Sequence, residues 1–310
     1  MPKIIFLDAA TVSDLPVFAR FTELGDFTAY DRSPPETVLD RCRGAEIVIT
    51  NKVPFDGERI AALPDLRLIC IAATGKNHID LEAADRRGIA VRNVAGYSTD
   101  SVVQTTFASL FAVSMDLCAL DNQVQLGHYS AQPDFSFWRR PFYELRGKRY
   151  GIIGLGTIGR GVARVAEAFG AEVVYYSTSG RNDDQPYPRL ELDELLATSD
   201  VVSIHCGLNE RTRNLLGTRE LERMKSSAYL VNMGRGGIVN EADLAGALGQ
   251  GKIAGAAVDV FEREPLPQHH PYLNIGGGSP LFLTPHVAWA SVEARTRLVE
   301  GIVKNIGAGY

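Results

Sequence analysis

Cysteine is scarce in this chain of 310 residues, and its four copies are scattered. They stand at Cys42, Cys70, Cys118 and Cys206, each within or beside an apolar segment, and no C-x-x-C pair occurs. This spacing argues against a disulfide framework and against a cysteine-ligated metal site. We therefore expect four buried free thiols and no metal centre.

The sequence also lacks a block of basic residues and a long apolar run. Its formal net charge is -5, which argues against nucleic acid as the main partner. The apolar run near Met1 is too short for a signal peptide, and no later run approaches the roughly 18 residues of a membrane-spanning helix. Internal repeats and low-complexity segments are absent as well. We expect a cytoplasmic protein with neither a membrane nor a nucleic-acid partner.

A glycine-rich stretch at residues 150–160 organises the second half of the chain. An apolar run at 150–153 passes into Gly154, Gly156 and Gly159 in G-x-G-x-x-G spacing, and a helical apolar pattern follows. Such glycines make a tight turn, let a pyrophosphate approach the backbone, and let the helix lie close to the strand. A second strand pattern at 172–176 has the spacing of a βαβ unit. The stretch predicts a dinucleotide site, with an ordinary tight turn as the alternative.

Strand and helix patterns alternate on both sides of this motif. The first part predicts a small parallel sheet from strands at 3–7, 46–50, 66–72 and 89–92, with helices at 15–24, 35–42, 56–63 and 79–87. The second part predicts strands at 150–153, 172–176, 201–205, 228–232, 253–258 and 281–283, with helices at 192–198 and 241–248 among those between them. Six strands with crossover helices match a doubly wound dinucleotide-binding fold.

Three further segments link these parts. Residues 98–121 contain neither proline nor glycine and predict one long, largely buried helix. Residues 132–141 break all periodicity and predict a loop with exposed aromatic side chains, either an oligomer contact or a flank of the active site; a loop tucked onto its own domain is the alternative. Residues 291–306 predict a helix that packs back onto the first domain.

The end of the strand at 172–176 bears on the choice of cofactor. An NAD-preferring site usually has a carboxylate there that accepts hydrogen bonds from the ribose 2′-hydroxyl. Here Ser177, Thr178 and Ser179 precede Arg181. Their hydroxyls and the guanidinium could hold a 2′-phosphate, which favours NADP or use of both cofactors. The alternative is a polar loop that holds the ribose loosely, so NAD stays open.

Three candidate catalytic residues each stand just beyond the end of an expected strand. Arg235 lies between glycines after the strand at 228–232, Glu264 follows the strand at 253–258, and His286 follows the strand at 281–283. An arginine fork can bind a carboxylate, and a histidine beside a glutamate can act as acid and base. Because the carboxyl ends of parallel strands meet at one edge of a sheet, these residues predict an active site there.

At these motifs the chain resembles the D-isomer-specific 2-hydroxyacid dehydrogenases over nearly its whole length. The resemblance implies that Arg235 holds the substrate carboxylate and carbonyl, that His286 is the acid/base, and that Glu264 orients it. It also implies backbone contacts from Thr74 and Gly75 to the substrate. The cofactor contacts that it implies, beyond the three motif glycines, are Thr106, Thr157, Ile158, Met233 and Asp259.

The same resemblance implies an α/β fold with a Rossmann-type dinucleotide-binding domain, residues 98–287, inserted into a flavodoxin-like substrate domain, residues 1–97 and 288–310. Relatives are generally homodimers in which the long helix contributes to the interface. Residues 133–138 and Trp289 look most like glycerate dehydrogenases, also called hydroxypyruvate reductases, so Trp289 is a further candidate at the substrate.

The predicted activity is thus NAD(P)-dependent interconversion of a small 2-keto acid and the D-2-hydroxy acid, with hydroxypyruvate or glyoxylate as the favoured keto acid. D-lactate dehydrogenase activity is one alternative. A dinucleotide-sensing, corepressor-like binding protein is an alternative of another class, although the chain has no charged tail or added partner-binding segment. Two further departures from the family pattern are Gln104-Thr105, where many relatives have Glu-His, and Gly207, where many have Pro.

Overall fold

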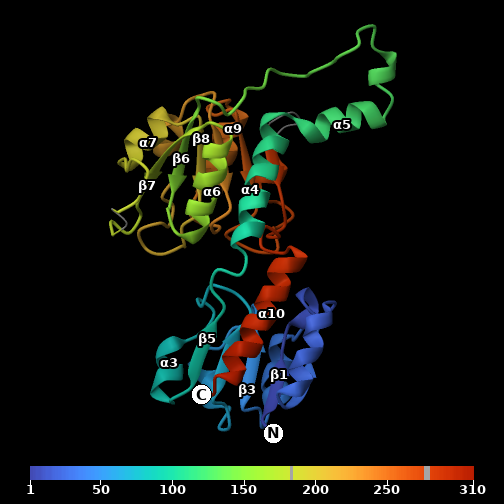
Figure 1. Ribbon diagram of the computed structural model, residues 1–310, viewed down its shortest axis with the longest axis vertical. Helices are drawn as coiled ribbons and strands as arrows, with labels where there is room; N and C mark the ends of the chain where they lie inside the picture. The colour runs from blue at the N-terminus through green and yellow to red at the C-terminus, as the bar shows by residue number, and fades with distance from the viewer. Residues whose placement is uncertain (182–183, 276–279) are drawn as a thin grey trace. The chain divides into compact units, whose positions relative to one another are not determined.

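The computed structural model describes residues 1–181, 184–275 and 280–310. The chain forms two compact units: Met1–Ser98 with Trp289–Tyr310, here the first unit, and Thr99–Ala288, here the second unit. Figure 1 shows a sheet flanked by helices in each of them. The α/β fold with two parallel sheets, expected from the sequence, is confirmed.

The first unit is built on a parallel five-stranded sheet in the order β2-β1-β3-β4-β5, which is the flavodoxin-like order. Alternate side chains of its strands point to opposite faces: Ile4 and Phe6 join one apolar cluster, Ile5 and Leu7 the other. The strands are β1 (Lys3–Phe6), β2 (Asp26–Ala29), β3 (Ile47–Thr50), β4 (Leu68–Ile71) and β5 (Ala90–Asn93).

Helices cover both faces of this sheet. The C-terminal helix α10 (Val292–Gly307) buries Leu298 and Ile302 in the same cluster as Ile4 and Phe6, and Ser291 caps it by accepting from the Ala294 N–H. The other face carries α1 (Val38–Cys42), α2 (Gly57–Ala61) and α3 (Leu81–Arg86). The expected helix at 15–24 is a 3-10 helix, η2 (Pro16–Glu23); shorter 3-10 turns are η1 (Ala9–Thr11) and η3 (Pro35–Thr37).

The second unit contains a parallel six-stranded sheet in the order β11-β10-β9-β8-β6-β7. The chain reverses direction across the sheet between β6 and β8, the place where such folds bind ligands. The strands are β6 (Arg149–Ile153), β7 (Glu172–Tyr176), β8 (Val201–Ile204), β9 (Tyr229–Asn232), β10 (Gly255–Val258) and β11 (Leu281–Leu283). A parallel bridge from Tyr175 to Arg189 extends the β7 edge.

Two apolar clusters fill the faces of this sheet, one of them against α4 and α6. The helices are α4 (Thr99–Ser114), α5 (Leu117–Gln125), α6 (Thr157–Ala168), α7 (Leu192–Thr198), α8 (Thr218–Arg223) and α9 (Glu241–Gly249), with 3-10 turns η4 (Tyr129–Ala131) and η5 (Pro271–Leu273). No single helix among the described residues is long and apolar enough to cross a membrane, although α4 and α5 together pass that test with a bend of 63° between them.

The prediction of one long, buried helix at 98–121 is wrong. The helix breaks after Ser114, where Asp116 adopts a left-handed conformation with φ of 58°. An aspartate tolerates this conformation better than most residues, and its carboxylate faces Arg139 and Arg140 at 3.5 and 3.3 Å. The chain then turns outward into α5, which has no buried residue.

Residues 117–141, here called the arm, extend away from the sheet of the second unit (Figure 1). Its aromatic side chains are exposed as expected: Phe135 keeps 92% of its surface in contact with solvent and Trp138 keeps 62%.

The prediction of four buried thiols is wrong for two of the cysteines. All four thiols are free. Cys118 is exposed because it lies on α5 rather than in a core, and Cys206 is only partly buried.

Candidate active site

The glycine-rich turn between β6 and α6 has the geometry of a phosphate-binding loop. Gly154 has φ of 94°, and a Cβ there would lie 2.7 Å from the Cys206 Cβ. A Cβ on Gly159 would lie 2.3 Å from the Gly154 carbonyl oxygen, so helix and turn touch closely. Nothing lies within 4 Å of a Cβ on Gly156, and this residue caps α6 without a side-chain hydrogen bond. The open backbone and the helix N–H groups of Thr157 and Ile158 fit a pyrophosphate.

Two loops next to this turn enclose a shallow pocket of about 450 Å³, here called the β7–β8 pocket. Thr178, Ser179 and Arg181 line it from the loop after β7, as the sequence predicted for a ribose site. Asn209, Glu210 and Arg211 line it from the loop after β8 and were not foreseen. Ser177 is not part of the lining: it is 6% exposed, and its Oγ has no hydrogen-bond partner among the described residues.

His286 and Glu264 form a hydrogen-bonded pair. The Nδ1 of His286 lies 2.8 Å from Oε1 and 2.7 Å from Oε2 of Glu264. Oε1 also accepts a hydrogen bond from the Phe261 N–H at 3.1 Å, which fixes the carboxylate. Since a carboxylate accepts, Nδ1 carries the proton in this contact. Proton exchange with a substrate therefore falls to Nε2.

The loop that carries His286 is anchored by Asp259. This residue is 1% exposed, and its carboxylate accepts hydrogen bonds from the Thr284 hydroxyl at 2.7 Å and from the N–H groups of Val287 and Ala288 at 2.9 and 3.0 Å. Burial raises the pKa of Asp259, against the lowering effect of these hydrogen bonds. The sequence predicted a cofactor contact for Asp259 and missed this anchoring.

Arg235 stands in a loop shaped by Asn232. The buried Asn232 side chain accepts from the Gly234 N–H at 3.1 Å and donates to the Arg235 carbonyl oxygen at 3.2 Å. The Arg235 guanidinium donates to the Gly234 carbonyl oxygen at 2.8 Å. A Cβ on Gly236 would lie 1.9 Å from the Phe261 carbonyl carbon, so the backbone of the arginine loop packs directly against the segment that leads to Glu264.

The catalytic candidates thus come from three neighbouring strands. Arg235 follows β9, Glu264 follows β10 and His286 follows β11, and these strands pair side by side in parallel. Their carboxyl ends lie at the same edge of the sheet as the glycine turn after β6, so the chemical groups and the phosphate loop share one edge. Among the described residues no group of three or more His, Cys, Asp or Glu side chains could hold a metal ion.

The other predicted residues have different surroundings. Met233 is buried beside the arginine loop. Thr106 lies inside α4, fully buried, and its hydroxyl donates to the Val102 carbonyl oxygen of the same helix. Thr74, Gly75 and Trp289 belong to the first unit, where the Thr74 carbonyl oxygen accepts from the Asn93 side chain and Trp289 packs edge-on against Tyr97. The roles of all these residues toward cofactor and substrate stay predictions.

A family model for the "D-isomer specific 2-hydroxyacid dehydrogenase, NAD binding domain" matches residues 107–288, more than half of the chain. The chain belongs to this family. A glycerate dehydrogenase of Methylorubrum extorquens is 35% identical over 99% of this chain and 95% of its own. A hydroxypyruvate reductase of Blautia hydrogenotrophica is 36% identical over 91% of this chain and 88% of its own.

Among solved structures, an NADPH-dependent glyoxylate/hydroxypyruvate reductase from Sinorhizobium meliloti, in complex with NADP and malonate, aligns with a TM-score of 0.85. It is 27% identical and the match covers 99% of this chain and 93% of the other. The family membership expected from the sequence is confirmed. This dehydrogenase is an NAD(P)-dependent oxidoreductase that acts on the CH–OH group of its donors.

Proposed function

We propose that this dehydrogenase reduces hydroxypyruvate or glyoxylate, as a glycerate dehydrogenase-like enzyme. The observation that carries the proposal is the His286–Glu264 pair, with its two short Nδ1 contacts, at the sheet edge that also carries Arg235 and the glycine turn. Relatives that bear the names glycerate dehydrogenase, hydroxypyruvate reductase and glyoxylate reductase support the choice of substrate.

The bound nicotinamide would supply the hydride to the keto carbon. As negative charge develops on the keto oxygen, His286 donates a proton from Nε2, while Glu264 holds the ring through Nδ1 and stabilises its cationic form. A guanidinium is a permanent cation with a planar set of donors, so Arg235 acts as a clamp for the substrate carboxylate and carbonyl rather than as an acid.

Steady-state kinetics with hydroxypyruvate, glyoxylate and pyruvate, each with NADH and NADPH, test this function. We expect the highest kcat/KM with one of the first two keto acids. Fastest turnover of pyruvate would instead indicate a D-lactate dehydrogenase. No turnover of any of the three would favour the corepressor-like binding protein.

We further propose that the enzyme uses NADP, or both cofactors. A carboxylate is missing at Ser177, and the β7–β8 pocket presents hydroxyls and guanidinium groups. The substitution Ser177→Asp places a negative charge at the end of β7, where it can accept from a ribose 2′-hydroxyl and repel a 2′-phosphate. The ratio of kcat/KM for NADPH to that for NADH should fall at least about tenfold. A ratio equal to that of the wild type would contradict this proposal.

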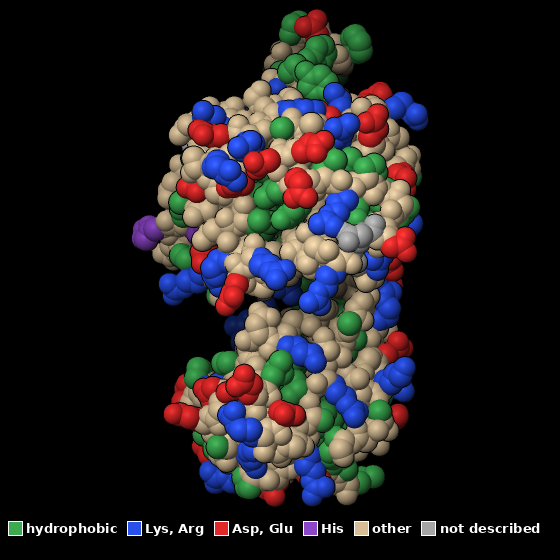
Figure 2. All heavy atoms as spheres, turned by 90° about the vertical axis from the view of Figure 1, so that its left-hand side faces the viewer, with side chains coloured by type: hydrophobic (Ala, Val, Ile, Leu, Met, Phe, Trp, Pro, Cys, Tyr) green, Lys and Arg blue, Asp and Glu red, His purple; other side chains and the backbone are tan. Residues whose placement is uncertain are grey.

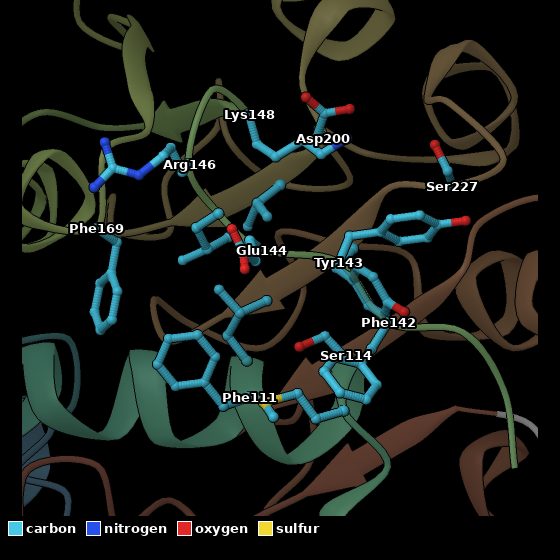
Figure 3. A pocket seen from close by; sticks show the side chains of 15 residues that line it. Phe111, Ser114, Phe142, Tyr143, Glu144, Arg146, Lys148, Phe169, Asp200 and Ser227 are labelled. Carbon is cyan, nitrogen blue, oxygen red and sulfur yellow. The ribbon is translucent and has the colours of Figure 1, made fainter. Parts of the chain in front are cut away.

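The functional assembly that we propose is a homodimer formed through the arm. Leu126 and Phe135 are exposed by 68% and 92%, and single molecules rarely leave so many large apolar side chains in solvent on one segment. The same unit also contains an apolar pocket of about 580 Å³ between α4 and the segment that follows the arm, a second apolar surface that a partner chain could cover. Figure 3 shows Phe111, Phe142 and Tyr143 around it, with Asp200 and Ser227 from the amino ends of strands.

The cytoplasmic location expected from the sequence stays a prediction.

A further inference from the structure

The loop after β8 contributes half of the β7–β8 pocket. Arg211 lines the pocket together with Thr178 and Arg181, although these residues stand about thirty positions apart in the sequence. In Figure 1 the loops that follow β7 and β8 both emerge at the carboxyl-end edge of the sheet. Figure 2 faces the side that carries β7 and α7, and Lys and Arg side chains, in blue, gather toward that edge of the unit. The pocket therefore has two cationic residues from two different loops.

Hydrogen bonds hold the second loop in one shape. The buried Thr212 hydroxyl donates to the Gly207 carbonyl oxygen at 2.8 Å and accepts from the Asn209 N–H at 2.8 Å. The Asn209 side chain in turn accepts from the Arg211 N–H at 2.9 Å. These bonds fix the backbone of Arg211 and involve none of its side chain, so the guanidinium can serve a ligand.

The charges in the pocket fit a phosphate group. Within the described part of the chain, neither Arg181 nor Arg211 forms an ion pair with a carboxylate. Glu210 also lines the pocket, so two cations and one carboxylate leave a net charge of one positive unit. Arg213, two positions further on, differs: its guanidinium pairs with Glu262 at 3.6 Å and does not line the pocket.

We propose that Arg211 is a specificity-determining residue that binds the 2′-phosphate of NADP together with Arg181. In this proposal the Glu210 carboxylate weakens the binding of that phosphate, so that the enzyme can use NAD as well. The proposal rests on the proposed use of NADP or both cofactors. Two guanidinium groups on separate loops can approach a phosphate from different sides and make charge-assisted hydrogen bonds to different oxygens. The carboxylate repels the same phosphate and can accept from the 2′-hydroxyl of NAD.

A binding experiment without keto acid tests Arg211 directly. The dissociation constants of 2′,5′-ADP and 5′-AMP are measured by calorimetry for the wild type, Arg181→Ala, Arg211→Ala and Glu210→Gln. Arg213→Ala, which removes a cation from the same loop but outside the pocket, is the matched control. We expect Arg211→Ala to weaken 2′,5′-ADP binding roughly ten- to a hundredfold, because a charge-assisted hydrogen bond is lost.

The other variants sharpen the result. Glu210→Gln should tighten 2′,5′-ADP binding severalfold, whereas 5′-AMP binding should stay within about twofold in the three arginine variants. The Arg211→Ala effect should shrink at high salt because the pocket is open to solvent. Equal affinity of wild type and Arg211→Ala for 2′,5′-ADP, or an equal loss in Arg213→Ala, would overturn the proposal.

The kinetic counterpart separates this proposal from the proposed activity. In Arg211→Ala, kcat/KM should fall for NADPH and stay within about twofold for NADH, whichever keto acid is used. An enzyme that turns over no keto acid refutes the proposed substrate class, yet the 2′,5′-ADP titration still decides the role of Arg211. Equal losses with both cofactors would count against a contact with the 2′-phosphate.

Discussion

At the scale of single residues, the chemistry depends on how each ionisable group is held. Glu264 makes two contacts of 2.7 and 2.8 Å to one nitrogen of His286, and a backbone N–H fixes its carboxylate in place. Asp259, buried directly after the same strand, β10, accepts hydrogen bonds from the Thr284 hydroxyl and from the N–H groups of Val287 and Ala288, and so holds the loop that carries His286. Of these two acids, both after β10, Glu264 thus orients the histidine and Asp259 stabilises the loop that carries it.

Replacement of His286 should abolish most of the turnover. Because its φ is 54°, asparagine, which tolerates this conformation, is a cleaner replacement than alanine. We expect His286→Asn, like His286→Ala, to lower kcat by about 10² to 10⁴, while Arg235→Ala should raise KM and lower kcat. Steady-state kinetics with the preferred keto acid measure both effects. Full turnover in either His286 variant would refute its role as the acid.

His205 gives a prediction for stability at acidic pH. Its Nδ1 is buried without a partner among the described residues, and burial lowers its pKa to about 3 from 6.5. Below pH 6.5 the unfolded chain takes up a proton that the folded chain refuses, so the free energy of unfolding falls as the pH drops toward 3. Between pH 7 and 5 we expect His205→Gln to lose roughly 1–2 kcal/mol less than the wild type. Urea unfolding at both pH values checks this, and equal losses would refute it.

At the scale of elements, the loops at the strand ends are fitted to one another by close backbone contacts. The Arg235 loop touches the Phe261 backbone through Gly236, and the glycine turn touches α6 through Gly159. Most strands were predictable because they are short apolar runs bounded by turn residues. The sequence missed β2 (Asp26–Ala29), a short and largely exposed strand at the edge of the first sheet. The break at Asp116 was not, because no glycine or proline marks it and two distant arginines hold the aspartate there.

Two glycine substitutions test this fitting. Gly236→Ala would place a Cβ 1.9 Å from the Phe261 carbonyl carbon and should lower the free energy of unfolding by at least about 2 kcal/mol. Gly246→Ala, within α9 with nothing within 4 Å of its Cβ, is the control and should stabilise by roughly 0.5–1 kcal/mol. Denaturant melts compare the two. Similar stability of both variants would show that the loop contact is not tight.

At the scale of the whole molecule, the arm is the part of the second unit that contributes no residue to the apolar clusters of that unit. None of the α5 residues is buried, and the arm exposes four large apolar side chains to solvent: Val124, Leu126, Phe135 and Trp138. An apolar surface of this kind is expected to be covered by another chain. The sequence marked the aromatic residues of this segment but took α5 for the end of a buried helix.

Charged substitutions in the arm should dissociate the proposed homodimer. We expect the wild type to sediment at twice the mass of one chain and the double variant Leu126→Glu/Phe135→Glu to sediment as a monomer at micromolar concentration. Leu81→Glu, an exposed leucine on α3 in the first unit, is the control and should leave the wild-type mass unchanged. A monomeric wild type, or a double variant that stays dimeric, would contradict assembly through the arm.

The sequence by itself determined the two parallel sheets, the glycine turn and the family, because strand patterns and short motifs are local properties of the chain. It also marked Arg235, Glu264 and His286, since each directly follows a strand. Only the tertiary structure decided that Asp259 anchors the loop that carries His286, and it brought Arg211 beside Arg181. These are contacts between loops after different strands, and the order of strands in the sheet sets them, not their order in the chain.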